Sequence, residues 1–178
     1  RARSDAAEML AVPCLVERLV DIDKELAVMV ARNWHGEIAT YPVVEAKFDA
    51  RANILDLIQA PASVAPVVEA QCLALARRVV ESLDGVGIFG IEFFLTRGGE
   101  VLVNAISPRP HNSGHYTIEA CATSQFEQHL RAVADMPLGP TTLLKPAASF
   151  NLLGAPDAHG VPRLEGLQKA HETDGASV

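Results

Sequence analysis

Apolar residues along this chain fall into short runs that are rich in β-branched side chains, a pattern typical of β-strands. These runs predict strands over residues 14–20, 25–31, 37–44, 54–58, 85–95 and 101–106. The turn Asn33-Trp34-His35-Gly36 would join the second strand to the third, and Thr96-Arg97-Gly98-Gly99 would join the last two. Both connections favour antiparallel hairpins.

One long segment has the helical period instead. From Val67 to Leu83, apolar residues recur every three or four positions and charged residues occupy the other side. Shorter helices are expected over residues 4–11, 124–133 (with a start as early as 118) and 161–176. The region from Leu138 onward is rich in proline and reads as irregular. The order of elements predicts an α+β domain with an antiparallel sheet and helices packed on one face.

Composition narrows the function classes. With 49% apolar and 21% charged residues, the chain is expected to be globular. Its net charge of −7 argues against nucleic-acid binding, and no apolar run is long enough to predict a membrane span. No signal peptide is evident at the start. The scattered Cys14, Cys72 and Cys121 read as buried thiols, so a cytoplasmic location is expected.

Glu92 stands in the otherwise apolar run IEFF. Burying a carboxylate costs several kcal/mol, roughly, unless it is paired or bound to a metal ion. Mg²⁺ prefers such oxygen ligands beside substrate phosphates. The alternative is a carboxylate on the exposed face of a half-buried strand, and the sequence leaves both interpretations open.

The loop that follows, SPRPHNSGH over residues 107–115, concentrates hydrogen-bonding groups around two prolines. Arg109 suits carboxylate or phosphate binding through paired hydrogen bonds, which favours an anion site. Alternatively, Ser113 or Thr117 caps the next helix, or His111 and His115 hold a metal, although a third metal ligand is not evident.

Glu17 and Glu25 bracket a short stretch between two predicted strands. Both carboxylates could point into one cleft and accept hydrogen bonds from ribose hydroxyls or an exocyclic amine. The alternative, which the residues alone favour, is that they are ordinary surface charges.

Three blocks resemble a known family. They resemble the signature of the 5-(carboxyamino)imidazole ribonucleotide synthases, which are ATP-grasp ligases. The match is nearly residue for residue over PRPHNSGH (residues 108–115), YTIEA (116–120) and TSQFEQHLRA (123–132). The resemblance extends over about residues 13–154. It implies that 1–154 form the C-terminal part of an ATP-grasp domain, its second lobe, and that 155–178 begin a truncated C-terminal segment.

The resemblance also implies roles for individual residues. The hinge beside adenine would be formed by Glu17, Arg18, Leu19 and Val20, and the ribose would be held by Glu25. Glu92 would bind Mg²⁺ (or Mn²⁺), and Asn104 would lie beside the phosphates. The pocket for bicarbonate and aminoimidazole ribonucleotide would be lined by Arg109, His111, Asn112 and Ser113. Arg109 and His111 would be the catalytic residues.

The activity so implied is ATP-dependent carboxylation in de novo purine biosynthesis. Bicarbonate and ATP would give carboxyphosphate and ADP, and the amine of 5-aminoimidazole ribonucleotide would then capture the carboxyl group. The partners would be the small-molecule substrates. The resemblance also implies a homodimer, because members of the family form dimers.

Two residues depart from the family pattern, and parts of the family's enzyme are missing. Ala105 stands where the family has a glutamate that shares the metal with the other carboxylate, and Phe48 stands where several relatives have a histidine that contacts ATP. The N-terminal domain and the glycine-rich loop of the family are absent, so we expect a piece of a longer protein that is inactive alone. The alternatives are a degenerate nucleotide-binding lobe, or another ATP-grasp ligase such as a biotin carboxylase or a formate-dependent transformylase.

Overall fold

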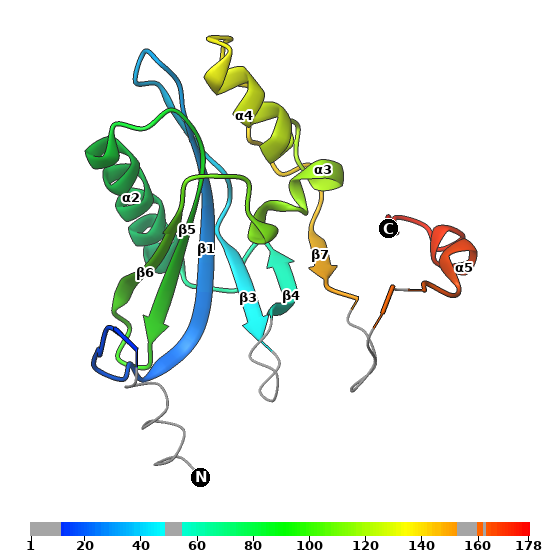
Figure 1. Cartoon of the computed structure of the whole chain (residues 1–178), viewed down its shortest axis with the longest axis horizontal. Helices are drawn as coiled ribbons and strands as arrows, with labels where there is room; N and C mark the ends of the chain where they lie inside the picture. Colours follow the sequence, from blue (N-terminus) through cyan, green and yellow to red (C-terminus); the bar gives the residue numbers. More distant parts are fainter. Residues whose placement is uncertain (1–11, 49–54, 153–159, 162) are drawn as a thin grey trace.

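The computed structural model describes residues 12–48, 55–152, 160–161 and 163–178. Its centre is a seven-stranded sheet in which every pair of neighbouring strands is antiparallel. The strands are β1 (Ile22–Arg32), β2 (Ile38–Thr40), β3 (Val44–Phe48), β4 (Leu55–Ala60), β5 (Gly87–Thr96), β6 (Val101–Ser107) and β7 (Ala147–Phe150). Six of them follow the order β6-β5-β1-β3-β4-β7, and β2 pairs with the end of β1 (Figure 1).

Among the residues that the structure describes, the helical elements are short except for one. They are α2 (Pro66–Leu83), the 3₁₀ turn η1 (Asn112–Gly114), α3 (Thr117–Ala120), α4 (Gln125–Val133) and α5 (Leu167–His171). No helix among the described residues is long and apolar enough to cross a membrane.

Strand β1 lies at the centre of the sheet and is buried on both faces. From Leu26 to Ala31 every side chain is at most 2% exposed, which explains why this stretch is almost continuously apolar. Leu26, Val28 and Val30 point to the side of α2, and Ala27, Met29 and Ala31 point to the other side. The strand therefore separates two hydrophobic clusters.

The helix α2 covers the first face. Its buried residues Val68, Cys72, Ala76 and Val80 recur at four-residue spacing and pack with Phe89, Ile91 and Phe93 of β5. Pro66 occupies the first turn, where its missing N–H costs no hydrogen bond, and Asp84 ends the helix in a left-handed conformation.

The second face is covered by the segment that contains η1 and α3. Tyr116, Ala120 and Cys121 pack there against Ala27, Met29 and Tyr41, and the Tyr41 hydroxyl donates to the carbonyl of Thr123 at 3.0 Å. The α+β class with an antiparallel sheet is confirmed. Helical segments cover both faces, however, so the expectation of helices on one face is wrong (Figure 1).

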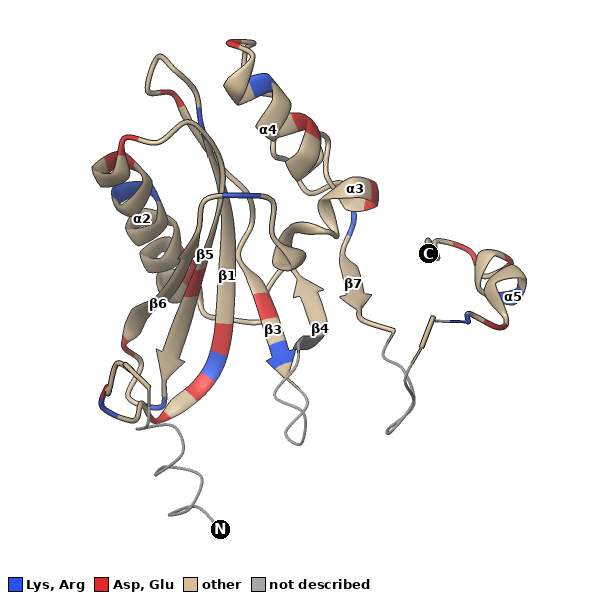
Figure 2. Cartoon of the chain, viewed as in Figure 1, with Lys and Arg blue, Asp and Glu red and all other residues tan. Residues whose placement is uncertain are grey.

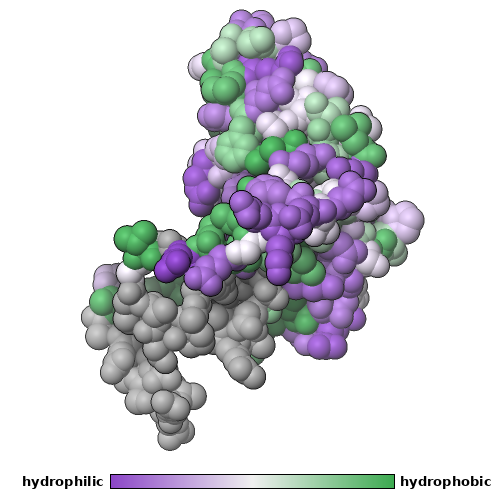
Figure 3. Space-filling model, turned by 90° about the vertical axis from the view of Figure 1, so that its right-hand side faces the viewer, coloured by the Kyte–Doolittle hydropathy of each residue, from purple (hydrophilic) through white to green (hydrophobic). Residues whose placement is uncertain are grey.

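Helix α4 lies beyond this segment and is amphipathic. Its inner side buries Gln125, Gln128 and Ala132. On its outer side Phe126, Leu130 and Val133 remain exposed, and Figure 3, which faces this side of the molecule, shows hydrophobic side chains interspersed among hydrophilic ones.

Four predicted strands and the long helix are confirmed with small shifts at their ends. The predicted strand 37–44 is in fact two strands, β2 and β3, because Pro42 lacks an N–H for the ladder. The predicted strand 14–20 is wrong: residues 13–21 are irregular, and no described strand pairs with them. Leu19 is 95% exposed and Cys14 is exposed as well, so only Cys72 and Cys121 fit the expectation of buried thiols.

The other differences concern the two ends of the chain. The predicted helix 4–11 and the boundary at residues 154/155 lie outside the described residues. The irregular region after Leu138 contains the short strand β7, and the expected last helix is limited to the five residues of α5.

Candidate functional site

The site is built on the face of the sheet opposite to α2. Glu92 on β5 is paired with Ala27 of β1 on one side and with Ala105 of β6 on the other. Because directly paired residues point to the same face, two small side chains flank the carboxylate. The Glu92 side chain keeps 31% of its surface exposed, so it is neither fully buried nor an ordinary surface charge.

A second carboxylate approaches from the neighbouring strand. Glu25 of β1 pairs with Phe94 and therefore lies on the face of Glu92. Partial burial, and then the negative charge of Glu92, raise the pKa of Glu25 above its ordinary value. Figure 2 shows acidic positions on β1, β3 and β5, three strands that are adjacent in the sheet.

A pocket of about 150 Å³ lies between these carboxylates and the loop after β6. It is lined by Glu25, Leu26, Ala27, Ala46, Phe48, Ile58, Glu92, His111, Asn112 and Ser113. The structure thus brings together six of the residues singled out in the sequence, from four separate segments of the chain. A larger, more open hollow near residues 59–63 and 146–148 holds none of them.

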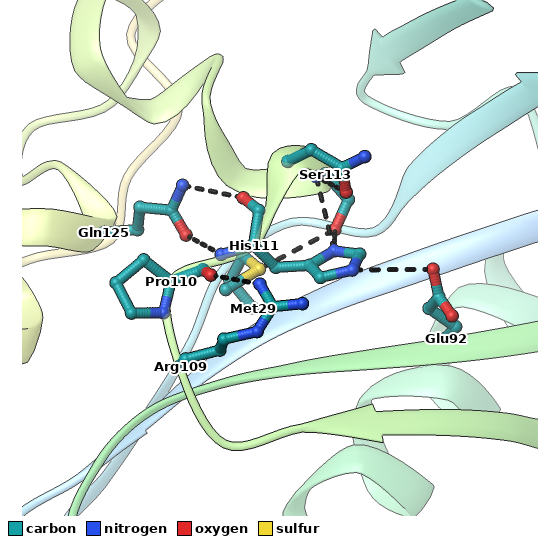
Figure 4. A network of polar contacts seen from close by, with 8 residues as sticks. Met29, Glu92, Arg109, Pro110, His111, Ser113 and Gln125 are labelled. Carbon is teal, nitrogen blue, oxygen red and sulfur yellow. Dashed lines mark hydrogen bonds and ion pairs between the residues drawn. The ribbon is translucent and has the colours of Figure 1, made fainter. Parts of the chain in front are cut away.

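His111 connects the loop to the sheet. Its Nε2 lies 3.7 Å from Oε1 of Glu92, and its Nδ1 lies 2.8 Å from the Ser113 hydroxyl (Figure 4). The Ser113 backbone N–H also points at Nδ1, at 3.4 Å. With donors at Nδ1 and a carboxylate at Nε2, we assign the proton of the neutral ring to Nε2.

The charge state of His111 follows from its surroundings. Burial lowers the pKa of His111, Glu92 opposes this effect, and Arg109 and His115 reinforce it. The net shift is downward, so the imidazole is neutral near pH 7. Since the unfolded chain binds a proton at higher pH than the folded one, this group makes the folded state lose stability as pH falls below about 6.5.

A titration tests this assignment. Glu92→Gln is expected to lower the pKa of His111 further, because it removes the charge that favours the imidazolium. The same substitution is expected to lower the pKa of Glu25, because it removes a like charge. NMR titration of both side chains measures the two shifts, and a rise in either pKa would contradict the described contacts.

The glycine that precedes Glu92 by two positions lets this loop approach the sheet. A Cβ at Gly90 would lie 2.8 Å from the Cβ of His111. We expect Gly90→Ala to destabilise the fold by about 1–3 kcal/mol, because it overpacks this contact. Gly98→Ala is the matched control, since its Cβ would meet no atom closer than 3.6 Å. Thermal unfolding compares the two, and equal losses would count against a tight loop.

Other residues from the motif have structural partners. Ser113 is 2% exposed and also lies 3.8 Å from the sulfur of Met29. Asn112 Oδ1 accepts the Ser113 N–H at 2.9 Å. Thr117 Oγ1 accepts the N–H of Gln125, whereas the cap of α4 is Ser124, so the expected capping role falls to neither Ser113 nor Thr117.

Arg109 and His115 of the loop are exposed and have partners outside the pocket. Arg109 is exposed and its Nη1 donates to the carbonyl of Pro110 at 2.9 Å. His115 is exposed and stacks on Phe126 at 6.0 Å between ring centroids. Within the described ranges no three His, Cys, Asp or Glu side chains are grouped to hold a metal ion, so a His111–His115 metal site has no support.

The structure separates several predicted nucleotide contacts from the pocket. Glu17, Arg18 and Leu19 are exposed, and with Val20 they belong to the irregular stretch before β1, so Glu17 and Glu25 do not share the pocket described above. Asn104 is exposed at an irregularity of the β5–β6 pairing. The roles implied for these five residues toward ATP stay predictions.

One functional contact escaped the sequence analysis. The buried Gln125 bonds both backbone groups of His111, from a position fourteen residues further along the chain. Gln125 lies on the side of α4 that carries Gln128, away from the apolar Phe126, Leu130 and Val133, so the sequence pattern gave no sign that it is buried or what it contacts.

The chain is similar in sequence to known proteins. Residues 2–126 match the ATP-grasp domain family. The N5-carboxyaminoimidazole ribonucleotide synthase of Bacillus subtilis is 48% identical over 141 residues, which are 79% of this chain and 37% of that protein. The phosphoribosylaminoimidazole carboxylase of Saccharomyces cerevisiae is 44% identical over 172 residues, 93% of this chain and 29% of that protein.

Solved structures show the same likeness. The N5-carboxyaminoimidazole ribonucleotide synthetase from Thermotoga maritima has a TM-score of 0.79 and 56% identity, covering 88% of this chain and 41% of that one. The N5-carboxyaminoimidazole synthase from Aspergillus clavatus, in complex with ADP and 5-aminoimidazole ribonucleotide, has a TM-score of 0.78 and 37% identity, covering 86% and 42%. The chain spans well under half the length of each of these relatives. Its sequence match and its sheet place it in one family: the chain belongs to the ATP-grasp family.

Proposed function

We propose that this chain is the second lobe of a longer ATP-dependent ligase that carboxylates 5-aminoimidazole ribonucleotide with bicarbonate. The observation that carries the proposal is the pocket in which Glu25, Glu92 and His111 meet. Support comes from the Bacillus subtilis and Thermotoga maritima relatives, which are named for this synthase activity, and from the Aspergillus clavatus complex with ADP and the ribonucleotide.

The reaction needs two steps that balance in atoms and charge. Bicarbonate oxygen attacks the γ-phosphorus of ATP, the bond to ADP breaks, and carboxyphosphate forms. The exocyclic amine of the ribonucleotide then attacks the carboxyl carbon, releases phosphate and loses a proton. The protein's task in such a transfer is to position the reactants and to neutralise charge.

The pocket residues divide between these tasks. On the nucleotide side, Glu25 would accept hydrogen bonds from ribose hydroxyls, and Phe48 would give an apolar wall. On the other side, the Nε2–H of His111 and the side chains of Asn112 and Ser113 would orient bicarbonate and the ribonucleotide. Arg109 would bind an anionic group by turning away from the Pro110 carbonyl.

The pocket fits a magnesium site in which the described chain supplies a single carboxylate ligand. Mg²⁺ is commonly held by one or two carboxylates together with substrate phosphates, and the partly exposed Glu92 supplies one such ligand. Bound there, the ion would neutralise phosphate charge. Its second ligand in the family pattern is missing, since Ala105, directly opposite Glu92, carries no side-chain oxygen.

The experiment is an assay of phosphate release by the complete protein with ATP and 5-aminoimidazole ribonucleotide. Because of Ala105, it is run on the natural sequence and on Ala105→Glu. We expect release that depends on bicarbonate and on the ribonucleotide. Phosphate release that depends on formate and not on bicarbonate would instead indicate another ATP-grasp ligase.

Ala105 also favours a second candidate, a lobe that binds nucleotide without turnover. Calorimetry of MgATP with the natural protein and with Ala105→Glu separates the two. Binding without turnover in both proteins would support this candidate. The homodimer, the cytoplasmic location and the division into residues 1–154 and 155–178 belong to the first proposal and remain predictions.

A further inference from the structure

Two buried glutamines lie one turn apart on α4 and make the same kind of contact. Each is 0% exposed, and each carboxamide both accepts from and donates to the backbone of a single distant residue. Gln125 Oε1 accepts the His111 N–H at 2.9 Å and its Nε2 donates to the His111 carbonyl at 2.8 Å. Gln128 bonds Gly139 in the same way, at 2.8 Å in both directions. The two glutamines differ in the segment they bind: Gln125 bonds the loop before η1, and Gln128 bonds the loop after α4.

Gln125 holds the residue whose imidazole faces the pocket. His111 has an extended backbone (φ −130°, ψ 151°) between Pro110 and η1, where no strand or helix satisfies its N–H. Figure 4 shows the Gln125 carboxamide on the backbone side of His111 and Glu92 on the ring side. The position of this one peptide thus decides how far the ring reaches toward Glu92.

The surroundings leave the carboxamide little room to move. A Cβ at Gly114 would lie 2.6 Å from Oε1 of Gln125. The backbone N–H of Gln125 donates to Thr117 Oγ1 at 2.9 Å, and this hydroxyl donates to the Gly114 carbonyl at 2.5 Å. The first residue of α4 is therefore fixed against the turn that follows His111.

We propose that Gln125 is a positioning residue: its carboxamide fixes the His111 peptide so that Nδ1 meets Ser113 and Nε2 faces Glu92. The positional effect follows from the contacts alone, and its consequence for turnover rests on the proposed function. Gln128, which holds the loop after α4, is a purely structural counterpart with matching chemistry and burial.

The first arm of the test is spectroscopic and uses the complete protein. Gln125→Met and Gln128→Met each remove two hydrogen bonds at nearly constant volume, so similar losses in melting temperature are expected. ¹⁵N NMR of the His111 ring should show a protonated Nε2 and an acceptor Nδ1 in the natural chain and in Gln128→Met. In Gln125→Met the two nitrogens should shift toward averaged values. If Gln125→Met fails to fold, Gln125→Glu is measured in its place, because it keeps an acceptor for the His111 N–H and loses only the donor to the His111 carbonyl.

The second arm uses the complete protein carrying Ala105→Glu. We expect Gln125→Met to lower kcat/KM for the ribonucleotide about tenfold or more, as misplacement of a reacting geometry does, with KM for ATP nearly unchanged. Gln128→Met should keep kcat/KM. Equal effects of the two variants on the His111 spectrum, or no effect of either, would overturn the positioning role. Absence of turnover in the protein with Gln125 and Gln128 intact would refute the proposed function, whereas the His111 spectra would still decide the positioning role.

Discussion

Ala105→Glu is expected to strengthen the binding of MgATP to the complete protein by about tenfold to a hundredfold, the range typical when a group that supports a metal is changed. Position 105 is paired directly with Glu92 across the β5–β6 ladder, so the new carboxylate would point to the same face at the distance of a cross-strand pair. Two carboxylates there would complete the oxygen ligands that Mg²⁺ prefers. Calorimetry with and without Mg²⁺ measures the gain.

Val103→Glu is the matched control. It adds the same charge to the same strand, but position 103 pairs with Phe93, which points to the α2 side. This control should leave MgATP binding unchanged. A similar gain in both variants, or a gain that persists without Mg²⁺, would show that the added carboxylate does not act through a metal beside Glu92.

Glu92→Gln is expected to lower kcat/KM by about a hundredfold to a thousandfold in the complete protein carrying Ala105→Glu, the loss typical when a preorganised charge-stabilising group is removed. The substitution keeps the shape of the side chain and removes its charge at a position that interacts with Glu25 and His111 and lines the pocket. Initial rates of ADP formation measure the loss.

Glu100→Gln makes the same change at an exposed position in the β5–β6 turn and should keep full activity. Melting temperatures of both variants separate a functional loss from unfolding. Turnover that survives in Glu92→Gln at the level of Glu100→Gln would remove Glu92 from the proposed site.

The central part of the fold could be predicted because burial leaves a clear pattern. Strand β1 is covered on both faces and reads as a dense apolar run, and α2 shows its buried residues at four-residue spacing. The stretch 14–20 has a strand-like composition, yet a strand also needs a hydrogen-bonded neighbour, and no described strand pairs with this stretch. Strand β7, with the sequence AASF, carries too weak a β-propensity to be recognised.

The candidate site was predictable in its residues but not in its connections. Glu92 attracted attention because a carboxylate interrupts an apolar strand, and His111 because a proline-rich loop concentrates donors. The pairing of Glu92 with Ala105 depends on the register of a hairpin that contains an irregularity. The contact of Gln125 with His111 spans fourteen residues and depends on how α4 packs, so periodicity alone cannot reveal it.

The most direct test of the central claim is transfer of ¹³C-bicarbonate to 5-aminoimidazole ribonucleotide, followed by ¹³C NMR of the carbamate carbon. The complete protein carrying Ala105→Glu is predicted to form this carbamate with one ADP released per carboxyl group transferred. The additional change Glu92→Gln should nearly abolish the signal. ADP release without a carbamate, or no reaction at all by the Ala105→Glu protein, would contradict the assignment of this pocket to carboxylation of the ribonucleotide.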